Sequence, residues 1–206
     1  MEDKKMRDCS REIVKAQCET IGRLMRILFW GYGIFVVGAA AMGIWISSQA
    51  SDLFAVSLAN TGSGLAGYAL FRGGMTVSFP QGVLNSAASL VPKLTYLIGY
   101  FVGILGHLVV WGMLLQLRTI FRNIDFHETP FSLDNCRALF RMGILIIVFG
   151  IVRGSVLRVL CSFWKIGGSG GSPADFALII VGAVVISISY IFEYGTALQK
   201  ESDETL

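Results

Sequence analysis

Four long apolar stretches dominate this sequence of 206 residues. A helix needs about 20 apolar residues to cross the ~30 Å hydrocarbon layer of a bilayer, and its backbone polar groups must be satisfied within the membrane. The stretches lie at residues 27–47, 97–117, 143–164 and 176–194. The composition agrees, since 54% of the residues are hydrophobic and only 15% are charged. We therefore predict an all-α integral membrane protein with a four-helix transmembrane bundle over residues 27–194.

Lys and Arg are distributed unevenly among the segments outside these spans. Most lie before the first span, between the second and third spans, or after the fourth. Because positive residues near span ends are retained in the cytoplasm, we predict that both termini and the hairpin 118–142 are cytoplasmic and that segment 48–96 is external. The tail 195–206 is then cytoplasmic too. The net charge of +3 is explained by this topology, so we expect no direct nucleic-acid partner.

The basic N-terminal segment 1–26 has the pattern of an amphipathic helix. Val14, Cys18, Ile21 and Met25 recur at spacings of three and four residues, which places them on one helical stripe. This pattern predicts an interfacial helix that leads into the first span. A short coiled-coil contact with a partner or a second copy, hence a homo-oligomer, is the alternative. The charged lead-in is long for a signal peptide, so we expect the first span to be retained.

The external segment is rich in Gly, Ser and Ala. Residues 75–79 alternate between apolar and polar side chains, which is typical of one edge of a small hairpin. Asn85 or Ser86 has the side chain needed to cap a following helix, and Pro92 marks a kink or a new start. A loop of this length is often functional.

Two arginines lie inside the third span. Arg158 is close enough to the external end to snorkel, whereas Arg153 lies near the midplane, where an arginine costs about 2.5–3.5 kcal/mol on insertion scales unless it is compensated. Three interpretations remain for Arg153: structural contact with helix carbonyls, Ser187 or Ser189; a pocket for an anion or a lipid; or a transport pathway. For His107, an imidazole hydrogen-bonded across helices is favoured over a ligand-binding group.

Small residues accompany the arginines on the same face of the third span. Gly150 and Gly154 form a G-x-x-x-G pair, and Gly99 and Gly103 of the second span repeat that spacing. Such pairs allow close approach of two helices in a membrane. We therefore predict that the second and third spans pack together along these glycines.

The sequence lacks the common catalytic and metal-binding motifs. It contains no P-loop, no dinucleotide glycine motif and no H-E-x-x-H, and neither histidine has a second ligand at metal spacing. We therefore predict no catalytic residues, no metal site and no cofactor, and we expect a protein that is not an enzyme.

Two motifs on the predicted cytoplasmic side resemble a known family. The first reads "IFRNI", then "PF", Asn135 and "RMG" between residues 120 and 143, and the second is the tail "IFEYGTALQKESDETL". Together they resemble the bacterial membrane family called domain of unknown function 2975, from which Phe140 and Met142 depart conservatively. The resemblance implies a four-span protein of the bacterial cytoplasmic membrane without an assigned activity. Members often occur beside a small helix-turn-helix regulator, which suggests a signalling role.

The leading hypothesis is a non-enzymatic membrane sensor or tether that docks a cytoplasmic transcription regulator. The alternative is a small transporter or immunity-like component, in which Arg153, Arg158 and His107 bind an anion, a lipid or a peptide. Internal hydrogen bonding is the competing interpretation of the polar docking residues. The candidates for docking are Asn123, Phe131, Asn135, Gln199, Glu201 and Asp203.

Overall fold

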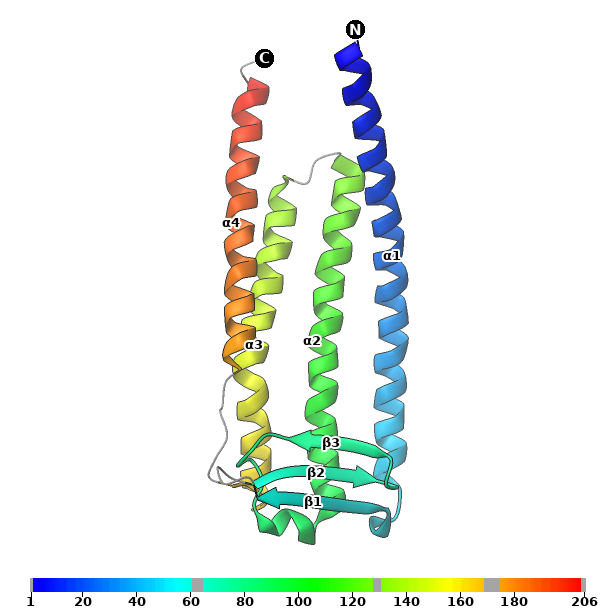
Figure 1. The fold of residues 1–206 in the computed structure, drawn as a ribbon, viewed down its shortest axis with the longest axis vertical. Coiled ribbons are helices and arrows are strands. Elements are labelled where there is room, and N and C mark those ends of the chain that lie inside the picture. The colour runs from blue at the N-terminus through cyan, green and yellow to red at the C-terminus, as the bar shows by residue number, and fades with distance from the viewer. Residues whose placement is uncertain (1, 61–64, 128–130, 169–174, 205–206) are drawn as a thin grey trace. The chain divides into compact units, whose positions relative to one another are not determined.

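The structure is a computed structural model of the chain (Figure 1). It describes residues 2–60, 65–127, 131–168 and 175–204, with the backbone alone at 2–19, 60, 65, 125–127 and 203. The chain divides into two compact units. The terminal unit comprises Met1–Ile34, Val109–Ile147 and Ile180–Leu206, and the sheet unit comprises Phe35–Leu108 and Val148–Ile179.

Long helices account for most of the described residues. They are α1 (Glu2–Ser47), α2 (Pro92–His127), α3 (Leu133–Phe163) and α4 (Phe176–Glu204). Each contains a segment apolar and long enough to cross a membrane. These segments are Thr20–Ser47, Pro92–Ile124, Leu133–Phe163 and Phe176–Ser202. The four predicted spans are therefore confirmed as apolar helices, and each helix is longer than its predicted span because polar residues extend it.

The helix α1 continues without a break through the predicted boundary at residue 26. The stripe of Val14, Cys18, Ile21 and Met25 therefore belongs to the same helix as the first span. Of this stripe, the side chains of Val14 and Cys18 lie outside the described residues. The interfacial position of this region remains a prediction.

A three-stranded antiparallel sheet lies between α1 and α2 in the sequence. Its strands are β1 (Phe54–Asn60), β2 (Leu65–Phe71) and β3 (Met75–Phe79), paired in that order. Short 3-10 helices at Ser51–Leu53 and Ser86–Leu90 flank the sheet. The alternation at 75–79 is thus confirmed as a strand, but the expectation of an all-α protein is wrong for this segment. A mostly helical protein with a small sheet is the correct description.

The core of the sheet unit lies between one face of the sheet and the start of α2. Phe54 pairs with Phe71 across β1 and β2, and both side chains are buried. Tyr96 of α2 is 1% exposed, and its ring centroid lies 5.5 Å from that of Phe54 and 6.1 Å from that of Phe71. Alternate side chains of a strand share a face. The strand residues that contribute to this core are Phe54, Val56, Leu58, Ala69, Phe71, Val77 and Phe79.

The end of α3 is joined to the segment before α2 through Asn85. Its side-chain oxygen accepts a hydrogen bond from the Ala87 backbone N–H at 2.8 Å, which confirms the predicted cap. Its side-chain amide donates to the carbonyls of Lys165 and Gly167 at 3.2 and 2.9 Å. Asn85 therefore holds the exit of α3 against the sheet unit, and α2 begins at Pro92 as expected.

Within the terminal unit, the helices approach one another at glycines. A Cβ on Gly143 of α3 would lie 2.9 Å from the carbonyl oxygen of Gly182 in α4. Gly33 of α1 lies beneath the indole of Trp111 in α2, where a Cβ would be 3.1 Å from the ring. Phe29 stacks on the same indole with 5.6 Å between centroids. These contacts define the α1–α2 and α3–α4 packing of this unit.

Candidate ligand-binding cavity

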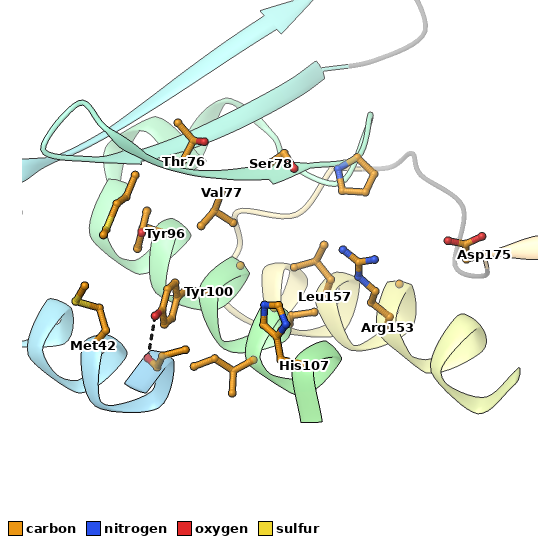
Figure 2. Close-up of a pocket in the computed structure, with 18 of the residues that line it drawn as sticks. Met42, Thr76, Val77, Ser78, Tyr96, Tyr100, His107, Arg153, Leu157 and Asp175 are labelled. Carbon is orange, nitrogen blue, oxygen red and sulfur yellow. Dashed lines mark hydrogen bonds between the residues drawn. The ribbon is translucent and has the colours of Figure 1, made fainter. Parts of the chain in front are cut away.

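The sheet unit contains a cavity of about 1020 Å³. Figure 2 shows that β3 runs across it and that α1, α2 and α3 supply its other sides. The start of α4 contributes Asp175 and Phe176. Its apolar lining includes Phe35, Ala39, Met42, Ile104 and Leu157, and its charged groups are Arg153 and Asp175. The volume lies near the upper end of the roughly 300–1,000 Å³ of small-molecule sites.

The four glycines predicted to join the second and third spans all line this cavity instead. A Cβ on Gly99 would meet Val77 and Phe79 of β3, and a Cβ on Gly150 would meet Leu178 and the Asp175 carbonyl.

A Cβ on Gly103 would meet nothing within 4 Å. At Gly99, Gly103 and Gly150 the nearest atoms therefore do not come from the predicted partner span. The spacing of these glycines shows which residues share a face of a helix, but it does not show what packs on that face. The two spans do meet in this unit, at Gly106 of α2, where a Cβ would lie 3.0 Å from the Phe149 ring of α3. Gly154 is the fourth of these glycines, and it faces the cavity beside Arg153.

Arg153 is exposed to the cavity rather than enclosed by protein groups. Its guanidinium carbon lies 5.8 Å from the centroid of the Phe149 ring. Among the described residues, no ion pair and no hydrogen bond is formed by this side chain. The hydroxyls of Ser187 and Ser189 donate to Ala183 and Ile186 of their own helix, at 2.9 and 2.7 Å. Arg153 would need the serine oxygens as acceptors, and among the described residues its side chain makes no such bond.

His107 and Arg153 line the same cavity although they are far apart in the sequence. Figure 2 shows both side chains reaching from α2 and α3 toward the cavity. The imidazole makes an edge contact with Phe35, with 5.3 Å between ring centroids. Arg158 is half-buried and is not among the residues that line the cavity. Of the three residues predicted to bind a ligand, only Arg153 and His107 therefore line it.

Asp175 is a site residue that sequence reasoning missed. Its backbone N–H donates to the Gly150 carbonyl at 2.7 Å, and its carboxylate accepts the Leu178 backbone N–H at 3.4 Å. It therefore lies at the start of α4 beside α3 and lines the cavity. Its position as a helix cap was readable from the sequence, but its proximity to Gly150 depends on the packing of two spans.

Two of the predicted docking residues are hydrogen-bonded to each other, as the competing interpretation expected. Asn135 is fully buried and accepts a hydrogen bond from the Asn123 amide at 3.1 Å. The Phe131 ring lies 5.4 Å from that of Phe192 and against Gly195. Asn135 is thus excluded from any docking surface, because its amide serves the interior of the terminal unit.

The rest of the proposed docking patch remains on the surface where it is described. Phe131 is 38% exposed despite its contacts, and the side chains of Gln199 and Glu201 are exposed. The Asp203 side chain lies outside the described residues. The predicted patch therefore loses Asn135, and Asn123 is half-buried, while Gln199 and Glu201 keep an exposed portion on α4.

The fold and the cavity define a class of mostly helical, multi-pass membrane protein with a ligand-sized cavity in one of its units. The model of the family described as "Protein of unknown function (DUF2975)" matches residues 82–206. The chain belongs to this family, as its two motifs indicate. Arg153, His107 and Asp175 lie inside the matched region, whereas α1 and the sheet lie before it. No curated protein and no solved structure shows significant similarity to the chain.

Proposed function

We propose that this protein is a non-enzymatic sensor of the bacterial cytoplasmic membrane that binds an amphiphile with an anionic head in the sheet-unit cavity. The observation that carries the proposal is the position of Arg153, an uncompensated cation that faces a mainly apolar cavity. In this topology both termini and hairpin 118–142 are cytoplasmic, and the sheet is external. A second copy of the chain is not required to complete the site.

The depth of Arg153 supports an anionic ligand. It lies ten residues before Phe163, the last residue of α3, which corresponds to ~15 Å along the helix. We take this distance from the end of the predicted span 143–164 as the depth of the guanidinium in the bilayer. A charge at that depth is costly unless an opposite charge or water compensates it. An anionic head bound between Arg153 and His107 supplies that opposite charge, and a guanidinium binds carboxylate or phosphate in a bidentate manner.

The remaining lining supports an acyl chain. Phe35, Met42, Ile104 and Leu157 present apolar side chains to the cavity, and Gly103 leaves one side of it without a side chain. An acyl chain that moves from the bilayer into this lining keeps an apolar environment. An amphiphile therefore satisfies both parts of the lining, whereas a small inorganic anion leaves the apolar part unused.

The proposal includes a signal to the cytoplasm. The exposed side chains Gln199 and Glu201 on α4 supply a surface for a partner such as a transcription regulator. Because α4 begins at the cavity with Phe176 and ends at Glu204, one helix connects the two regions. The transporter alternative has less support, since every residue that lines the cavity belongs to the sheet unit.

The test is lipid binding by the purified full-length chain, measured by native mass spectrometry. The probes are dioleoyl phosphatidylglycerol and dioleoylglycerol, which share their chains but differ in charge. We expect preferential binding of the charged lipid to wild type and its loss in Arg153→Met. Arg118→Met is the matched control, because Arg118 also lies over a phenylalanine ring, Phe29, at 5.0 Å but outside the cavity. Equal binding by Arg153→Met and wild type would refute the proposal.

A further inference from the structure

Two opposite charges line the same cavity from different helices. Arg153 comes from α3, and Asp175 precedes the first residue of α4 (Figure 2). The Asp175 backbone N–H donates to the Gly150 carbonyl at 2.7 Å. Gly150 lies about one helical turn before Arg153, on the same side of α3. The backbone contact therefore holds Asp175 beside Gly150 of α3, and both charged residues line the cavity.

The two side chains do not neutralise each other. Within the described residues, no ion pair joins Arg153 to Asp175. The guanidinium lies over Phe149, and the carboxylate caps Leu178 at 3.4 Å. Both side chains are exposed and line the cavity, so each charge is accessible to a ligand group of the opposite sign.

We propose that the head of the bound amphiphile is zwitterionic, with its phosphate or carboxylate at Arg153 and a primary ammonium at Asp175. This inference rests on the proposed function and specifies its ligand as a phosphoethanolamine-type head. Phe176, the neighbour of Asp175, also lines the cavity, and aromatic rings attract ammonium groups. A purely anionic head would leave Asp175 facing a like charge.

The capping role of Asp175 must be separated from ligand recognition. Asn is as good an N-cap as Asp, so Asp175→Asn removes the charge and keeps a side-chain oxygen for the Leu178 N–H. Asp52→Asn is the matched control. Asp52 is also exposed, in the first turn of a short helix in the sheet unit, but it does not line the cavity.

The experiment compares dioleoyl phosphatidylethanolamine with dioleoyl phosphatidylglycerol on the full-length chain by native mass spectrometry. We expect wild type and Asp52→Asn to prefer the ethanolamine lipid by at least fivefold. Asp175→Asn should lose this preference, while Arg153→Met should bind both lipids weakly. Soluble phosphoethanolamine is added as a competitor. If it displaces the lipid at equal concentration, the ligand is soluble phosphoethanolamine rather than a lipid that carries this head.

The outcomes separate this inference from the proposed function. Equal binding of both lipids by wild type, with loss in Arg153→Met, would overturn the zwitterionic head and leave the anion site intact. An unchanged preference in Asp175→Asn would likewise overturn the role of Asp175. Binding of either lipid no better than dioleoylglycerol would overturn the proposed function itself. A wild-type dimer that excludes lipid would show that a second copy fills the cavity, which contradicts both.

Discussion

Gly143 of α3 and Gly182 of α4 face each other so closely that a Cβ on Gly143 would lie 2.9 Å from the Gly182 carbonyl oxygen. The same Cβ would lie 2.5 Å from the Ile186 side chain. The carbonyl belongs to the backbone of a helix and cannot rotate away as a side chain can. This pair therefore sets the distance between α3 and α4 in the terminal unit.

We predict that Gly143→Ala destabilises the protein by about 1–3 kcal/mol, the usual cost of overpacking. Thermal unfolding in detergent, followed by far-UV circular dichroism, measures the effect. The control is Gly31→Ala on α1 in the same unit, where a Cβ meets nothing within 4 Å and alanine favours the helix. An unfolding temperature for Gly143→Ala equal to or above that of Gly31→Ala would refute this contact.

The hydrogen bond between Asn123 and Asn135 in the terminal unit predicts a second stability effect. Asn135→Ala leaves the half-buried Asn123 amide without the oxygen that accepts its N–H at 3.1 Å, and the loss of a typical hydrogen bond costs about 0.5–1.5 kcal/mol. A double-mutant cycle with Asn123→Ala measures the coupling in the same unfolding assay. Additive effects of the two substitutions would show that the hydrogen bond contributes nothing.

Some features of this fold could be predicted because local chemistry determines them. The spans follow from the length of the apolar stretches, and the caps at Asn85 and Ser132 follow from side chains that reach nearby N–H groups. Both caps are present, and Ser132 accepts the Asn135 backbone N–H at 3.2 Å. Pro130, which precedes α3 in the sequence, lies outside the described residues.

The sheet and the cavity depend on tertiary contacts that the sequence does not display. β2 contains Gly67 and two alanines, so its apolar alternation is weak, and its pairing with β1 and β3 defines it as a strand. The glycines Gly99 and Gly150 were correctly recognised as positions of close approach. Their partners could not be assigned, because small residues admit a strand or a helix start as readily as a second span.

The hydroxyl of Tyr100 joins α2 to α1 inside the sheet unit by donating to the Ala39 carbonyl at 2.8 Å. We predict that Tyr100→Phe lowers stability by about 0.6 kcal/mol, the average for hydrogen bonds between membrane helices. Tyr68→Phe on the exposed face of β2 is the control and should leave the unfolding temperature unchanged. A loss no larger than in the control would show that this bond is dispensable.

Filling the cavity should remove binding without harming the fold. In Gly103→Leu the new side chain enters open space, because a Cβ there meets nothing within 4 Å. We predict an unchanged or raised unfolding temperature together with loss of phosphatidylethanolamine binding. Gly31→Leu adds the same side chain outside the cavity and should bind normally. Normal binding by Gly103→Leu would place the ligand elsewhere.

The most direct measurement of the central claim is photocrosslinking in vesicles with phosphatidylethanolamine that carries a diazirine in its acyl chain. Peptide mapping by mass spectrometry then locates the attached lipid. We predict crosslinks at Ile104 and Leu157 within the cavity, and their loss in Arg153→Met. Crosslinks confined to outward-facing side chains such as Ile27 and Val37, with the same pattern in Arg153→Met, would contradict it.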